Sequence, residues 1–189
     1  MNQKTDRPPD RPRARRPRAG KSTGPIVSSE HLASKKGWQL SELEFGLTVA
    51  NNAFSRWMVR CMAAVGYPDL APLDILVLHN VNHRRRAKRV ADICFMLNVE
   101  DTHTVTYALK KLVKASLVTG ERRGKEVFYM TSGVGAEACR KYRDVREQCL
   151  IASLRMMDVA EGDAVHDAAT LLRALSGLYD QAARAAASL

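Results

Sequence analysis

Signatures of the common enzyme classes are missing from this sequence. It contains no GxxxxGK(S/T) nucleotide loop, no GxSxG nucleophile elbow, no HExxH zinc motif and no CxxC pair. The acidic residues of EGDAVHD, residues 161–167, fall at a predicted helix boundary, where helix capping accounts for them. We therefore expect a non-enzymatic protein that needs no metal and no other cofactor.

Long apolar runs and closely spaced cysteines are missing as well. No stretch reaches the roughly 18 apolar residues of a membrane-spanning helix, and the N-terminus lacks the apolar core of a secretory signal. The four cysteines are typical of reduced, mostly buried thiols in a cytosolic chain: Cys61, Cys94, Cys139 and Cys149. We expect a cytoplasmic protein with no membrane partner.

Acidic side chains are outnumbered, and the excess of positive charge is concentrated in two places. The chain has 30 Lys and Arg against 20 Asp and Glu, a formal net charge of +10. Residues 1–36 hold ten basic and three acidic residues, are rich in proline, and are predicted to be a disordered basic tail. Residues 79–131 hold eleven basic and five acidic residues. This charge favours an anionic partner such as nucleic acid.

Three stretches have apolar residues at steps of three and four, which predicts amphipathic helices. The first covers residues 39–65 and is ended by a Gly-Tyr-Pro sequence at 66–68. The other two lie within residues 138–159 and 165–182, with Gly162 as a predicted helix stop and Asp163 as a predicted cap between them. Cys149 lies on the apolar stripe of the second helix, so we expect it in the core. These regular stripes fit a helical hairpin or a coiled-coil-like interface.

The central region has the parts of a winged helix. Residues 71–83 read as a buried helix with Pro72 in its first turn, and residues 90–98 as a short helix. A tight turn precedes a second helix, which Asp101 or Thr102 can cap. Residues 116–132 then alternate in the manner of a β-hairpin with a charged tip. The predicted fold is mainly α with a small β-hairpin wing.

The second helix of this region has two distinct faces. On a helical wheel, Val105, Leu109 and Leu112 form one apolar side, and the ridge from His103 to Lys114 opposite it contains no acid. A solvated surface helix is the alternative interpretation, but such helices usually alternate Glu with Lys. Short polar side chains in the first turn suit base edges, and the later lysines suit phosphates. With basic segments on both sides, we expect this helix to bind double-stranded DNA.

The sequence ADICFMLNVEDTHTVTYALKKLVKASLV, followed by MTSGVG, resembles the MarR family of winged helix-turn-helix transcriptional regulators. Tyr107 stands where arginine is common in that family, and Ser116 where glycine is usual. The resemblance implies a homodimer whose long terminal helices interleave and which binds a palindromic operator. It divides the chain into a tail (1–36), an N-terminal dimerisation helix (37–69), a winged helix domain (70–132) and a C-terminal dimerisation hairpin (133–189).

The resemblance and the charge pattern together give a set of DNA-binding residues. The recognition helix contributes His103, Thr104, Thr106, Tyr107, Lys110, Lys111 and Lys114. The segment before the motif contributes Arg84, Arg85 and Arg86, and the wing contributes Arg122, Arg123 and Lys125. The resemblance also implies a small-molecule effector, whose pocket Phe54, Trp57 and Met58 would line, although plain core packing explains Trp57 equally well.

An ArsR-like regulator that responds to a metal or to thiol chemistry is the alternative function. The wing segment ERRGKEVFY is as similar to that family as to MarR. His79 and His83 have the i,i+4 spacing that lets two histidines share a metal, but no third ligand stands nearby in the sequence. Cys139 and Cys149 lie too far apart along one helix to form a disulfide within one chain.

Overall fold

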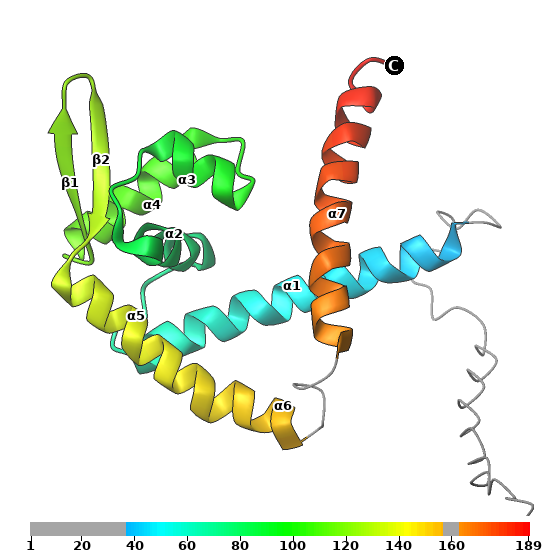
Figure 1. Ribbon diagram of the computed structural model, residues 1–189, viewed down its shortest axis with the longest axis horizontal. Coiled ribbons are helices and arrows are strands. Elements are labelled where there is room, and N and C mark those ends of the chain that lie inside the picture. Colours follow the sequence, from blue (N-terminus) through cyan, green and yellow to red (C-terminus); the bar gives the residue numbers. More distant parts are fainter. Residues whose placement is uncertain (1–36, 157–162) are drawn as a thin grey trace, which may run out of the picture. The chain divides into compact units, whose positions relative to one another are not determined.

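The computed structural model describes residues 37–156 and 163–189. The predicted basic tail and the predicted helix stop at Gly162 lie outside the described residues. The boundary between the two units of the chain falls between Ala50 and Asn51, inside the first helix. The described part is mainly helical with one β-hairpin, which confirms the predicted fold class (Figure 1).

The end of the first helix and the start of the second lie close to the predicted positions. Helix α1 runs over Trp38–Ala64, and Gly66, with φ of 102°, follows its end. Helix α2 runs over Pro72–Asn82 with the proline in its first turn. The Asp74 carboxylate accepts a hydrogen bond from the Ala71 N–H at 2.8 Å, which satisfies one of the amides that a helix N-terminus leaves without a partner.

The helix-turn-helix consists of α3 (Val90–Leu97) and α4 (Thr102–Lys114). Asn98, with φ of 52°, ends α3 in the left-handed conformation that asparagine tolerates better than most residues. Asp101 caps α4, because its carboxylate accepts a hydrogen bond from the His103 N–H at 2.8 Å. The predicted cap is confirmed, and it fixes the residue at which α4 starts.

The wing is an antiparallel hairpin of β1 (Val118–Arg123) and β2 (Glu126–Thr131). Gly124 has a φ of 64°, the left-handed conformation that a tight turn between twisted strands requires. Lys88 pairs with β2 through an isolated β-bridge. Its backbone exchanges two hydrogen bonds with Tyr129, of 3.0 and 2.8 Å. The bridge joins the segment before α3 to the base of the wing.

The joint between the wing and the next helix is tightly packed. Ser132 caps α5 (Gly133–Arg146) by accepting the Gly135 N–H at 2.9 Å, and its hydroxyl donates to the Ser116 carbonyl at 2.6 Å. A Cβ on Gly135 would lie 1.9 Å from the Leu117 carbonyl oxygen, so only glycine fits there. Ser116 has a φ of 58°. Glycine adopts this conformation without strain, which explains why it is usual at the corresponding position of the MarR family, which the sequence resembles.

The C-terminal helices differ from the prediction in one respect. The stripe from residue 138 predicted one continuous α-helix, but a π-helical turn at Glu147–Ile151 separates α5 from α6 (Ala152–Met156). A π turn accommodates extra backbone and so rotates the residues that follow it. Cys149 lies in this turn and is exposed, so its predicted core position is wrong for the single chain. Helix α7 covers Asp163–Ala186.

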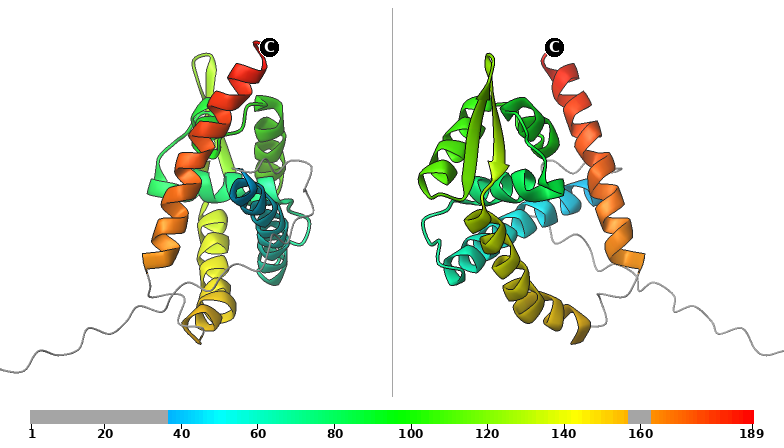
Figure 2. Two further views of the ribbon diagram at one scale, coloured as in Figure 1. Left: turned by 90° about the vertical axis from the view of Figure 1, so that its right-hand side faces the viewer. Right: turned by 60° about the vertical axis from the view of Figure 1, so that its left-hand side comes forward.

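The core lies within the winged helix region and the ends of the helices beside it. Side chains of α2, α3 and α4 meet there, joined by Met58, Cys61 and Met62 from α1 and by Ala138, Cys139 and Tyr142 from α5. The views of Figure 2 show the hairpin turn projecting beyond α3 and α4. The core therefore holds α4 by its apolar side and leaves its polar side outside.

Candidate nucleic-acid interface

Helix α4 presents a clean division between a buried and an exposed side. Val105, Ala108, Leu109 and Leu112 are buried in the core. Four side chains of the predicted ridge are exposed (His103, Tyr107, Lys110 and Lys114), whereas Lys111 is half-buried. Tyr107 stands out with 72% of its surface accessible. A large aromatic ring that faces solvent on a helix with a fully packed opposite side is available for a partner.

The threonines of α4 are tied to their own backbone. The Thr104 hydroxyl donates to the Asp101 carbonyl at 2.7 Å, and the Thr106 hydroxyl donates to the Thr102 carbonyl at 2.8 Å. Each bond fixes the rotamer and uses the only hydrogen that the hydroxyl has to donate. The outward-facing chemistry of these two side chains is therefore a methyl group and oxygen lone pairs.

Lys111 forms an ion pair with Asp74, which the sequence pattern did not predict. Its ammonium lies 2.8 Å from the Asp74 carboxylate and donates to the Asp69 carbonyl at 2.6 Å. The Asp74 side chain is only 6% exposed, so this ion pair neutralises a buried charge at the start of α2. Lys111 is thus held by its own chain, whereas Lys110 and Lys114 are exposed.

The wing carries its positive charge at the closed end of the hairpin. Arg122, Arg123 and Lys125 are all exposed. The Arg123 guanidinium pairs with Glu121 at 2.6 Å and lies 5.1 Å from the centre of the Phe128 ring. The hydrogen bond and charge of Glu121 raise the pKa of Arg123 further. Arg123 is thus restrained by the hairpin, and Lys125 follows the turn at Gly124.

The basic segment between α2 and α3 contains residues of two kinds. Arg84, Arg85 and Arg86 are exposed, and the first two have φ of 61° and 47°, an unusual conformation for side chains larger than glycine. Lys88, by contrast, is buried and donates to the Asn80 carbonyl. Arg89 pairs with Asp92 at 3.0 Å and with Glu126 at 3.2 Å, which ties α3 to the wing. Sequence charge alone does not separate these roles.

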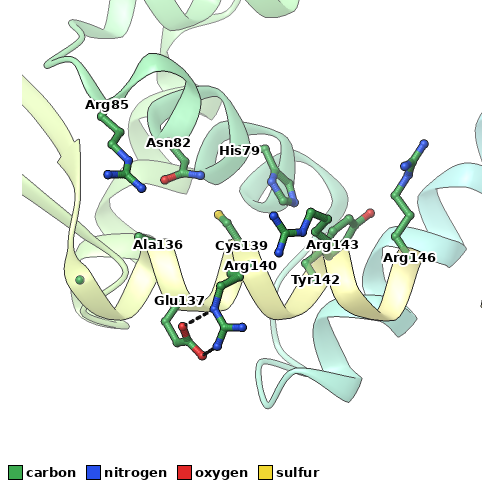
Figure 3. Close-up of a pocket in the computed structure, with 11 residues that line it drawn as sticks. His79, Asn82, Arg85, Ala136, Glu137, Cys139, Arg140, Tyr142, Arg143 and Arg146 are labelled. Carbon is green, nitrogen blue, oxygen red and sulfur yellow. Dashed lines mark hydrogen bonds and ion pairs between the residues drawn. The ribbon is translucent and has the colours of Figure 1, made fainter. Parts of the chain in front are cut away.

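A cavity of about 640 Å³ lies between α2 and α5 (Figure 3). Its lining includes Arg85 and three arginines of α5, at positions 140, 143 and 146. His79 contributes a ring that meets Tyr142 edge-on at 4.5 Å between centroids. The His79 Nε2 is buried and has no hydrogen-bond partner among the described residues, and burial lowers the pKa of this histidine. The cavity is therefore rimmed mainly by positive charge, and Glu137 in the same lining pairs with Arg140.

The predicted pocket residues lie elsewhere. Met58 is 2% exposed and belongs to the core, and Trp57 packs against it. Phe54 is exposed on α1. None of the three lines the cavity of Figure 3, whose residues come from α2, α5 and the segment after α2. No local sequence pattern marks this cavity, because its two walls are 48 positions or more apart in the chain.

Metal and thiol chemistry find little support in the described residues. No group of three or more His, Cys, Asp or Glu side chains is placed there to hold a metal ion, and His83 lies beyond the end of α2. Burial raises the pKa of the Cys61 and Cys139 thiols to about 11, which keeps them in the unreactive protonated form. Across residues 37–156 and 163–189, no helix is long and apolar enough to span a membrane.

Residues 70–134 match the family model described as a winged helix DNA-binding domain. This chain carries a winged helix DNA-binding domain. A search of curated protein sequences finds no significant match. Solved structures with the same fold include a mutant of MarR from E. coli complexed with operator DNA, at 17% identity, covering 75% of this chain and 99% of that one with a TM-score of 0.59.

Two further structures support the same fold. Overoxidized AbfR bound to DNA is 16% identical, covers 76% of this chain and 97% of its own, and has a TM-score of 0.60. A MarR family regulator from Neisseria meningitidis is 16% identical, with coverage of 76% and 95% and a TM-score of 0.57. The winged helix chain therefore has the MarR fold, as the sequence resemblance predicted.

Proposed function

We propose that this chain is a MarR-type transcriptional regulator that binds a palindromic operator as a homodimer. The observation that carries the proposal is the exposed, acid-free ridge of α4 inside a winged helix DNA-binding domain. His103, Thr104, Thr106, Tyr107 and Lys110 would face the major groove, and Lys114 would lie near a phosphate. The DNA complexes of two proteins with the same fold are consistent with this use of the domain.

The wing and the segment before α3 would supply phosphate contacts. Arg122, Arg123 and Lys125 lie at the exposed turn of the hairpin, and Arg84 and Arg86 are exposed after α2. Such contacts fix the register of a protein on the duplex but carry no sequence information. Arg85 lines the cavity beside α5 as well as facing solvent, so we expect it to contribute less to phosphate binding than Arg84 and Arg86.

The exposed apolar side chains of the terminal helices support the dimer. Helix α7 has no buried residue in the single chain, although Val165, Leu171, Leu172 and Leu178 are large and apolar. A stable soluble helix buries such a face against another element. A two-fold dimer would place two recognition helices about 34 Å apart, one turn of DNA, and so require a palindromic site.

The effector of the proposed regulator would bind in the cavity between α2 and α5. Its arginines favour a ligand that carries hydrogen-bond acceptors or negative charge. The cavity borders both the winged helix region and α5, so a ligand there is placed to alter how the two pack. The alternative thiol response would have to use Cys149, since the thiols at 61, 94 and 139 are buried.

The proposed division of labour is tested by selecting a binding site from a random duplex pool and comparing two variants on it. Lys125→Ala should weaken binding to all sequences and lower the slope of log affinity against log salt by about one unit. Thr104→Ala should instead reduce the difference between the selected site and its mutated versions. If no duplex is retained at low salt, or if the two variants behave alike, the proposed roles are wrong.

A further inference from the structure

We infer that the recognition helix reads thymine methyl groups rather than guanine edges. The inference rests on the proposed function, because it specifies what α4 would contact in the major groove. Arginine, asparagine and glutamine read guanine and adenine through paired hydrogen bonds, and α4 contains none of them. Of the side chains proposed to face the groove, His103 and Lys110 are the ones that could donate to guanine, and they are tested separately below. What it offers at the start of its ridge is His103, Thr104 and Tyr107.

The hydrogen bonds of the threonines leave these side chains without a hydrogen to donate to DNA. Thr104 and Thr106 both donate their hydroxyl hydrogens to backbone carbonyls, at 2.7 and 2.8 Å. A hydroxyl in this state has no hydrogen left for N7 or O6 of guanine, or for O4 of thymine. The methyl group of each threonine remains, and a threonine methyl is a recognised contact for the C5 methyl of thymine.

The surroundings of Thr104 continue the same apolar character. Tyr107 follows it by three residues, so the two side chains are neighbours on the helix surface. Together with His103 they border a hollow of about 480 Å³, whose other wall includes Ala71 and Leu73 at the start of α2 and the ion pair of Lys111 with Asp74. A thymine methyl is the one apolar group in the floor of the major groove, and this face is suited to cover it.

The test compares duplexes that differ only in the methyl group. Binding of the full chain to its selected, unmodified site is measured first. Failure at this step would overturn the proposed function, whereas the modified duplexes test how α4 recognises the bases. Each thymine of one half-site is then replaced by deoxyuridine, which keeps the base pair and removes the methyl. Loss of one buried methyl contact should weaken binding about fourfold.

Protein variants assign the contact to Thr104. Thr104→Ser removes the methyl and keeps the hydroxyl that bonds to Asp101, so this variant should bind thymine and uracil duplexes equally. Thr48→Ser is the matched control, because Thr48 makes the same type of bond, to the Glu44 carbonyl at 2.9 Å, on α1. It should keep the full preference for thymine. A Thr104→Ser variant that also keeps the preference would overturn the inference.

A second modified base tests the rival mode of reading. Replacement of guanine by 7-deazaguanine removes the N7 acceptor, which His103 or Lys110 would use if α4 read guanine. We expect these duplexes to bind within a factor of two of the unmodified site. If they bind weakly while the uracil duplexes bind normally, or if neither change has an effect, α4 does not read thymine methyls.

Discussion

Helices α4 and α7 have similar amphipathic sequences, but the chain treats their apolar sides differently. The apolar side of α4 is fully buried by Val105, Ala108, Leu109 and Leu112, whereas no residue of α7 is buried in the single chain. Helix α4 is therefore held entirely by its own chain, and its exposed side is available for DNA. Helix α7 is left with an apolar side that no described part of its own chain buries, and this side is the interface of the proposed dimer.

The largest effect should follow a change on the buried side of α4. Leu109→Ala leaves a cavity in a core position and should lower the free energy of unfolding by about 2–5 kcal/mol. Because this side is packed by its own chain, the loss should be the same at every protein concentration in urea unfolding. The matched change Leu172→Ala on α7, where Leu172 is 43% exposed, should cost less and should vary with protein concentration. If both variants lost the same free energy of unfolding at every protein concentration, the proposed difference between α4 and α7 would be wrong.

A charge on α7 should separate the proposed dimer. Leu172→Asp places a carboxylate on the apolar side, and the lost burial of one leucine alone should raise the dissociation constant of the dimer at least about tenfold. Sedimentation velocity across a range of concentrations measures this shift, and circular dichroism checks that helix content is kept. A wild-type chain that sediments as a monomer at every concentration would contradict the dimer.

Adjacent lysines of α4 offer a sharper version of the comparison within one helix. Lys111→Met leaves the nearly buried Asp74 carboxylate without its cation and should lower the free energy of unfolding by about 1–3 kcal/mol. Lys110→Met should change stability by less than about 0.5 kcal/mol but weaken DNA binding. Denaturant titration measures the stability of each variant, and gel shift measures its DNA affinity. A Lys111→Met variant with unchanged stability, or a Lys110→Met variant with unchanged DNA affinity, would contradict the two roles.

The comparison also shows which features the sequence predicts and which it does not. The two sides of α4, the Asp101 cap and the hairpin follow from local periodicity and turn chemistry, so they were predicted. The partner of Lys111 was not, because Asp74 lies 37 positions away and only tertiary packing brings the two together. The π turn at residues 147–151 was missed because the apolar stripe continues through it without a change of spacing. The cavity beside His79 depends on how α2 packs against α5, which no local pattern encodes.

The smallest predicted effect concerns His79, which is half-buried and whose Nε2 atom, unlike the apolar side of α4, is a buried polar group without a hydrogen-bond partner among the described residues. Burial lowers the pKa of His79 below its usual 6.5, so the unfolded chain binds a proton more readily than the folded chain. The contribution of this group to stability is therefore present above pH 6.5 and is lost as the pH falls below it. Thermal unfolding at pH 7.5 and 5.5 should show a smaller acid loss for His79→Gln than for the wild-type chain, and an identical loss would contradict the assignment.

The most direct test of the account is DNA binding by a chain that lacks the basic residues 1–36. If the ridge of α4 and the wing make the interface, this chain will still be retained on heparin and will bind duplex DNA at low salt. Its affinity will fall steeply as salt is raised, because lysine and arginine contacts release counterions from the phosphates. Loss of all binding at low salt would show that the tail carried the affinity and would contradict the winged helix interface.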